Sequence, residues 1–250
     1  MTAGQEHELF EELERLRAAL GVREREAAAK ERQLERYAAD LRETFKRERD
    51  QAEELPRSYT ATVRALSNAV EARDAYTGKH AERVTAYGME IARKLGLRRF
   101  ETSELEFGFL LHDIGKVAIP DAILYKPGAL TEDERALMSQ HPVIGAQMVH
   151  GIEFLSSAVD VVRSHHERWD GGGYPDGLAG EKIPLSARVF AVADVLDALT
   201  SDRPYRSAST MSVAREMIVA ESGRQFDPGI VDAFESIDDC KFQQIAAEVG

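Results

Sequence analysis

Seven residues able to bind a metal ion stand in unusual sequence contexts. Asp113 and Asp194 lie inside apolar segments, where a carboxylate is expected to be buried and to need a cation or a proton. For one such aspartate alone, a salt bridge or a hydrogen bond between helices is the more ordinary interpretation. The other members of the group are His80, His112, His141, His165 and His166. Imidazole and carboxylate without thiolate suit divalent ions such as Fe, Mn, Zn, Co or Ni.

Asp113 is the residue best suited to hold two ions together, because a carboxylate can bridge ions about 3.5–4 Å apart. Adjacent side chains on a helix point about 100° apart, so we expect His165 and His166 to serve two neighbouring ions, or one ion and the substrate. A pair of ions activates water and stabilises the attacking and leaving oxygens of a phosphoryl displacement. Each histidine alone would more often be an ordinary core or surface residue, so the inference depends on the group.

Three cationic residues follow these aspartates closely. Lys116 comes three residues after Asp113 and is expected to share its helical face. Arg203 and Arg206 bracket a rigid Pro-Tyr turn after the segment that contains Asp194, an arrangement that suits phosphate oxygens. Ordinary pairing with surface carboxylates is the alternative. A chain of net charge −12 needs such local positive groups if it binds an anion.

The elements that must position these residues all show helical spacing, and no stretch alternates convincingly at period two. We therefore predict an all-α fold. Ser103 with Glu106, and Thr131 with Glu134, match the capping box that begins a helix. The glycine-rich stretch 170–177 is expected to be a loop. The helices after residue 56 are expected at 59–75, 80–95, 105–117, 152–168, 185–199, 210–221 and from Asp227–Pro228 onward.

Residues 1–56 differ in composition from the rest and are predicted to form a charged helical extension, followed by a globular domain over 57–250. Apolar residues recur there at the two seam positions of a seven-residue repeat, although Arg17, Glu24, Glu31 and Glu48 interrupt the seam. A dimeric coiled coil, and hence a homodimer, is the preferred interpretation; a solvated single helix is the alternative. The apolar seam residues are Phe10, Leu13, Leu20, Ala27, Leu34, Ala38, Leu41, Phe45, Ala52 and Leu55.

Composition excludes several classes of protein. The chain has 250 residues and one cysteine, Cys240, which rules out a disulfide framework and a cysteine-rich zinc site. The negative net charge argues against binding DNA or RNA by bulk attraction. No apolar run approaches the roughly 20 residues that span a bilayer, and the first residues do not resemble a signal peptide. We therefore expect a cytoplasmic protein with no membrane partner.

Four ordered motifs resemble the HD phosphohydrolases and their HD-GYP branch. The stretch 111–116 reads LHDIGK, 165–178 reads HHERWDGGGYPDGL, 193–206 reads ADVLDALTSDRPYR, and 223–228 reads GRQFDP. A lone His-Asp pair would be weak evidence, whereas four motifs in this order are specific. The resemblance extends from about Leu66 to Phe234 and implies an HD-type helical bundle.

The resemblance implies a bacterial phosphodiesterase that hydrolyses cyclic di-GMP to linear pGpG, with GMP as a further product to be considered. It also implies two or three metal ions, commonly iron or manganese. By position, Lys116, Arg203 and Arg206 match phosphate-contacting residues of the family, and Gly172, Gly173, Tyr174 and Pro175 form the loop beside the site. The positions that match metal ligands are His80, His112, Asp113, His141, His165, His166 and Asp194.

One position departs from the family's pattern. Members with three metals carry an acidic ligand four residues before the first histidine, where this chain has Tyr76. A phenol is a poor ligand at neutral pH unless it loses its proton, so two metal ions are expected.

Two other functions are weighed beside the main one. The first is hydrolysis of another cyclic dinucleotide, such as cyclic GMP-AMP, or of a nucleotide phosphate ester. The second is a sensor that binds the dinucleotide with little turnover.

Overall fold

The computed structural model describes residues 3–73, 79–97, 99–202 and 206–249 and divides into two compact units, Met1–Tyr59 and Thr60–Gly250. Every regular element of the described residues is helical, and the only β-type pairing among them is an isolated bridge between Ser222 and Phe226. The all-α prediction is therefore confirmed.

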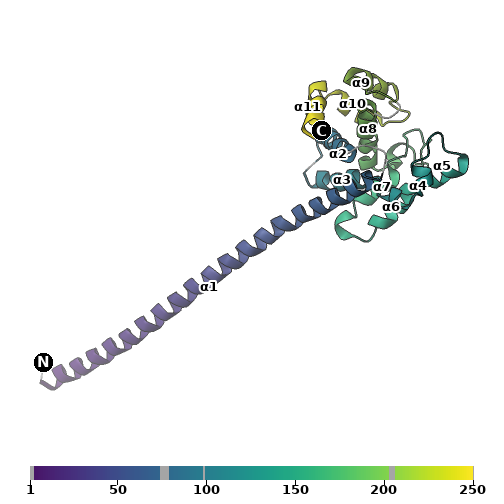
Figure 1. Cartoon of the computed structure of the whole chain (residues 1–250). Coiled ribbons are helices and arrows are strands. Elements are labelled where there is room, and N and C mark those ends of the chain that lie inside the picture. Colours follow the sequence, from purple (N-terminus) through teal and green to yellow (C-terminus); the bar gives the residue numbers. More distant parts are fainter. Residues whose placement is uncertain (1–2, 74–78, 98, 203–205, 250) are drawn as a thin grey trace. The chain divides into compact units, whose positions relative to one another are not determined.

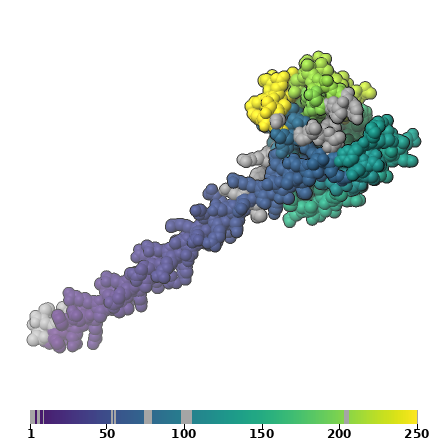
Figure 2. All heavy atoms as spheres, viewed as in Figure 1, coloured from purple at the N-terminus to yellow at the C-terminus, as the bar shows by residue number. Residues whose placement is uncertain are grey.

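The first unit consists of a single element. Helix α1 (Ala3–Glu71) includes the boundary between the units and continues through Pro56 (Figure 1). Large apolar side chains of its repeat, such as Phe10, Leu34 and Phe45, are each more than 60% exposed. Figure 2 shows this helix as a narrow rod with side chains standing out along it. Among the side chains that the structure describes in this unit, these seam residues are left open to solvent.

The second unit contains the end of α1 and a set of shorter helices, most of them 7 to 16 residues long (Figure 1). Helix α8 is apolar on nearly all sides, which is the pattern of a helix at the centre of a domain. The elements are α2 (His80–Lys94), α3 (Arg99–Leu111), η1 (Ile114–Ala118), α4 (Asp121–Leu124), α5 (Glu132–Met138), α6 (His141–Val149), η2 (Glu153–Leu155), α7 (Ala158–Ser164), η3 (Gly180–Lys182), α8 (Leu185–Thr200), α9 (Met211–Ala220), α10 (Pro228–Glu235) and α11 (Asp239–Val249).

Two groups of buried side chains hold this unit together. The larger joins α2, α3 and α8 to the C-terminal helices, and includes Tyr87, Phe109 and Phe190. The smaller joins the end of α1 to α3, α6 and α7, and includes Val63 and Leu111. The residues with metal-binding side chains lie where α2, α3, α7 and α8 meet these two groups.

Several predicted helix limits are wrong. The helix expected to begin at 59 is the continuous end of α1, and the helix expected to begin at 152 begins at Ala158. The helix expected over 105–117 breaks after Leu111 and resumes as the tighter η1, because Gly115 packs directly on α6: a Cβ there would lie 1.9 Å from the carbonyl oxygen of His141. The same helix begins at Arg99, so Ser103 lies inside it and is not its N-cap. The helix expected to reach 168 ends at Ser164.

In the part of the chain that the structure describes, no helix combines the length and the apolar character needed to cross a membrane.

Candidate metal centre

The carboxylate of Asp113 lies at the centre of a group of imidazoles. Its Oδ2 is 2.7 Å from Nζ of Lys116 and 3.1 Å from Nε2 of His112. Its Oδ1 is 3.2 Å from Nε2 of His141 and 3.8 Å from Nε2 of His165. Burial, the largest single effect, raises the pKa of Asp113, but Lys116, His112 and His141 together hold this pKa well below its usual value. Asp113 is therefore ionised.

Three of the imidazoles are oriented by the chain segment that carries them. Nδ1 of His112 lies 2.9 Å from the carbonyl of Phe109, Nδ1 of His141 lies 2.8 Å from that of Met138, and Nδ1 of His165 lies 3.0 Å from that of Val162. Each carbonyl comes from the last turn of a helix, where it lacks an intrahelical partner. A carbonyl only accepts, so Nδ1 carries the proton and Nε2 presents a lone pair.

These lone pairs point at one another and at a carboxylate oxygen. Nε2 of His141 lies 3.2 Å from Nε2 of His165, and Oδ1 of Asp113 is buried without a hydrogen-bond donor. Acceptor atoms that converge in this way need a cation. One ligand atom from each of Asp113, His141, His165 and His166 lies within 4.8 Å of the others. The donor set and its geometry fit divalent metal ions.

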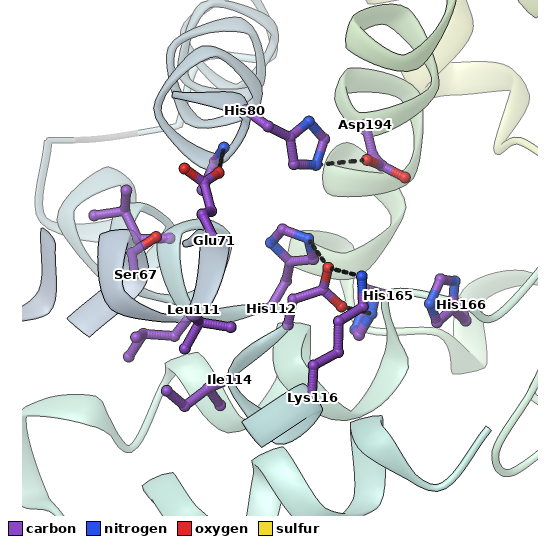
Figure 3. A pocket seen from close by; sticks show the side chains of 14 residues that line it. Ser67, Glu71, His80, Leu111, His112, Ile114, Lys116, His165, His166 and Asp194 are labelled. Carbon is purple, nitrogen blue, oxygen red and sulfur yellow. Dashed lines mark hydrogen bonds and ion pairs between the residues drawn. The ribbon is translucent and has the colours of Figure 1, made fainter. Parts of the chain in front are cut away.

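A second pair of ligand-type residues faces this group across the same cavity. Nε2 of His80, the first residue of α2, lies 3.4 Å from Oδ1 of Asp194 on α8 (Figure 3). Nδ1 of His80 lies 2.7 Å from Oδ2 of the fully buried Asp197. Asp197 also accepts a hydrogen bond of 2.6 Å from Nε of Arg83. Metal-binding histidines in proteins almost always have such a partner at the other ring nitrogen.

His166 is held differently from its neighbour. Helix α7 has ended, so the prediction that the two adjacent rings diverge by a helical angle does not apply; the centroids of His165 and His166 are 4.1 Å apart. The ring of Tyr174 stacks on His166 at 4.7 Å and 25°. Burial and the nearby His141 lower the pKa of His166 to about 3, so its imidazole is neutral as a ligand must be.

The loop that carries Tyr174 is fixed by close backbone contacts. The buried carboxylate of Glu167 accepts hydrogen bonds from the amides of Asp176 at 2.7 Å and Leu178 at 3.0 Å. Gly173 packs so tightly on the preceding segment that a Cβ there would lie 2.5 Å from Cα of Glu167. Tyr174 is thereby placed against His166.

The structure brings most of the predicted site residues to one cavity of about 170 Å³ that is open to solvent. His141 lies directly behind Asp113, in contact with it. Arg206 is exposed and donates a hydrogen bond to the carbonyl of Ala198 rather than lining the cavity. Arg203 and Tyr76 lie outside the described residues. The lining residues are Ser67, Val70, Glu71, His80, Ala81, Leu110, Leu111, His112, Asp113, Ile114, Lys116, His165, His166 and Asp194.

Sequence reasoning missed three carboxylates that organise the site. Asp197 lies three residues after Asp194 in the same apolar segment, and that position could have identified it. Glu167 directly follows the two adjacent histidines. Glu71, which lines the cavity from the end of α1, carries no comparable signal because acidic residues are common throughout that helix.

Comparisons with known proteins agree with this geometry. A model of the HD domain matches residues 64–230. The cyclic di-GMP phosphodiesterase response regulator RpfG of Xanthomonas campestris is 43% identical over 219 residues, which are 86% of this chain and 55% of that protein. The 3'3'-cGAMP-specific phosphodiesterase 2 of Vibrio cholerae is 43% identical over 169 residues, which are 67% of this chain and 32% of that protein.

A solved structure has the same fold. The cyclic GMP-AMP specific phosphodiesterase V-cGAP3 of Vibrio cholerae superposes with a TM-score of 0.57 at 22% sequence identity, over 75% of this chain and 53% of that one. The chain thus spans only about a third to a half of the length of these relatives. The resemblance to HD phosphohydrolases noted in the motifs is confirmed by the family match over residues 64–230. The chain belongs to the HD domain family.

Proposed function

We propose that this chain is a metal-dependent phosphodiesterase that hydrolyses cyclic di-GMP to linear pGpG. One observation carries the proposal: imidazole lone pairs converge on Oδ1 of Asp113, a buried oxygen that accepts no hydrogen bond. The ammonium group of Lys116 lies beside the same carboxylate. In the reaction, water adds to one phosphodiester phosphorus and one bridging P–O bond breaks, which opens the ring.

Two divalent ions, iron or manganese, would be held by the two groups of ligand-type residues at the two ends of the cavity. Bound ions of this kind activate water and neutralise charge on the phosphodiester. Asp113 belongs to the first group and is assigned as the ligand shared by the two ions. Tyr76, outside the described residues, supports two ions rather than three. The remaining ligands in this proposal are His112, His141, His165 and His166 at one end, and His80 and Asp194 at the other.

Substrate contacts are assigned to cations and to the loop beside the site. Lys116 lines the cavity and adds positive charge where a phosphate would lie. Arg206 is exposed near the end of α8 and is free to reach substrate outside the cavity, and Arg203 is assigned the same role from the sequence. The backbone of Gly173 and the ring of Tyr174 flank His166. A cavity of this size takes a phosphodiester group, so the bases would lie at its mouth.

The choice of cyclic di-GMP follows from RpfG, the relative that matches the longer part of this chain. The similarity to a 3'3'-cGAMP-specific enzyme favours a second substrate, another cyclic dinucleotide, at comparable identity. A binding protein with little turnover is a third function, and the complete His-Asp set argues against it.

Purified protein loaded anaerobically with Fe²⁺ or Mn²⁺ should convert cyclic di-GMP to pGpG faster than it converts 3'3'-cGAMP, as measured by product chromatography. Tight binding with negligible turnover would support the sensor instead.

Two substitutions separate the metal centre from the substrate contacts. Asp113→Ala should lose bound metal and turnover together, because it removes the carboxylate on which three imidazoles converge. Arg206→Ala should keep its metal, because Arg206 lies outside the cavity. It should bind substrate more weakly, because a substrate contact is removed. Elemental analysis and substrate titration measure these effects. Unchanged metal content in Asp113→Ala would refute the assignment of the centre.

The exposed seam of α1 supports a homodimer formed through residues 1–56 by a coiled coil, with residues 57–250 as the phosphohydrolase domain. Phe10, Leu34, Leu41 and Phe45 are each more than half exposed in a single chain, and a second copy would bury them. If replacing these four side chains by polar residues leaves the sedimentation of the protein unchanged, a coiled-coil dimer is excluded.

A further inference from the structure

Glu71 is the last residue of α1, and its carboxylate contacts the beginning of another helix. Oε1 accepts a hydrogen bond of 2.5 Å from the backbone amide of Ala81, and Oε2 accepts one of 3.1 Å from that of Lys79. These two amides flank His80, the residue with which α2 begins. One side chain of α1 therefore holds the backbone on both sides of His80. Figure 3 shows the carboxylate of Glu71 beside the start of the helix that carries His80.

The start of α2 depends on this contact because its own sequence supplies no cap. The N-cap position is occupied by Lys79, whose side chain makes no capping hydrogen bond and whose backbone is left-handed, with φ of 77°. The first amides of a helix have no partner within the helix, and a negative charge there is favourable. Glu71 supplies both the acceptors and the charge from a different helix.

His80 is thus held by two carboxylates. Glu71 fixes its backbone, and Asp197 fixes its ring through Nδ1 at 2.7 Å. The other ring nitrogen, Nε2, faces Asp194 in the cavity at 3.4 Å. A metal ligand works only when its position is held within about 0.5 Å by the groups around it.

We propose that Glu71 is a positioning residue for the metal centre, acting through His80. This inference rests on the proposed function in one respect: His80 must be a ligand. It adds that Glu71, the last residue of α1, determines the position of His80.

The test is a Mn²⁺ titration of the full chain, with the EPR signal of free Mn²⁺ as the readout and the temperature well below unfolding. Glu71→Ala should weaken the Mn²⁺ site served by His80 by about 10- to 100-fold, the range found when a group that orients a ligand is removed. Glu71→Gln keeps one acceptor oxygen and should lose less. Glu132→Gln, an exposed first-turn glutamate of α5, is the matched control and should bind as the unchanged chain does.

A double substitution shows whether Glu71 acts through His80. In a His80→Ala chain, Glu71→Ala should cause no further loss of Mn²⁺ affinity, because the group that it positions is gone. A further loss of similar size would mean that Glu71 acts on the metal directly, and an unchanged affinity in the single variant would mean that it only stabilises α2; either result overturns the proposal. If Glu71→Ala does not fold, the affinity of Glu71→Gln decides.

The proposed function fails separately from this inference. If the unchanged chain binds Mn²⁺ but hydrolyses no cyclic dinucleotide, the proposed function is wrong, while the Mn²⁺ titrations of the Glu71 variants still decide the role of Glu71. If the unchanged chain binds no Mn²⁺, both are wrong.

Discussion

Asp197 shows how a residue that never reaches the cavity governs one that does. It is fully buried, and the hydrogen bonds from His80 and Arg83 hold its pKa below the usual value despite burial, which alone would raise it. Its charge makes Nδ1 of His80 the protonated nitrogen and leaves Nε2 as the one that faces the metal site.

Asp197→Asn keeps the shape of this side chain and removes its charge. We expect Mn²⁺ affinity to fall by about 10- to 100-fold, since His80 loses the partner that orients it. The free energy of unfolding should fall by about 1–3 kcal/mol, because the guanidinium of Arg83 loses its carboxylate. A Mn²⁺ titration and urea unfolding in EDTA measure these two effects. Asp160→Asn, on the exposed side of α7, is the control; equal Mn²⁺ affinity in the two variants would contradict the role of Asp197.

At the scale of single residues, the sequence identifies charged side chains that stand inside apolar segments. It does not show where those side chains point. Asp113 and Asp194 stand out because apolar residues surround them. The same pattern cannot say that Asp194 faces the cavity while Asp197 lies behind it, since that depends on where α2 packs on α8. The backbone carbonyls that orient three of the rings leave no trace in residue types at all.

The element that carries Tyr174 depends on a glycine for a steric reason. At Gly173 an added Cβ would meet backbone atoms at 2.5 Å, which cannot move without displacing the loop. At the neighbouring Gly172 the nearest atom is the end of the Asp170 side chain, at 3.2 Å.

Gly173→Ala should therefore destabilise the protein by about 1–3 kcal/mol and weaken the stacking of Tyr174 on His166. Gly172→Ala should change stability by less than about 0.5 kcal/mol. Thermal unfolding compares the two variants, and the ring proton shifts of His166 in NMR report the stacking. A Gly173→Ala protein as stable as Gly172→Ala would show that the loop is not tightly packed.

Helix ends were predicted well where the signal is local. The capping box of Thr131 and Glu134 forms as expected, and Asp227 caps α10 with Pro228 in its first turn. Ser103 has the same spacing to Glu106, yet α3 begins earlier. At the other end, α7 stops at Ser164 where the loop 170–178 packs against the chain that follows it. Contacts between segments distant in sequence therefore override local spacing.

At the scale of the whole molecule, the seam of α1 predicts association. Replacing Leu34 and Leu41 together by glutamate should convert a dimer to a monomer in sedimentation, because charges would face each other across the seam. Ala29→Glu with Ala39→Glu adds the same charge to exposed positions outside the seam and should leave the dimer intact. If both double variants sediment alike, the dimer does not form through the predicted coiled coil.

The fold class and most of the helices could be predicted from periodicity, because most helices have an apolar face of their own. Helices α4 and α6 were not predicted. The pairing of the apolar faces could not be predicted from periodicity. Nothing in the sequence places His80 next to Asp194, and periodicity alone cannot bring the end of α1 to the metal centre, because these contacts follow from how two buried groups pack around α8.

Three of the imidazoles take their orientation from a carbonyl three residues earlier in the same segment, and this has a consequence for how the chain tolerates change. Each four-residue stretch sets its own ring, so insertions in distant loops leave the rings unaffected, whereas deleting a single residue within a stretch would rotate the lone pair away from its neighbours. The orientation of these three rings is therefore encoded locally, in 109–112, 138–141 and 162–165.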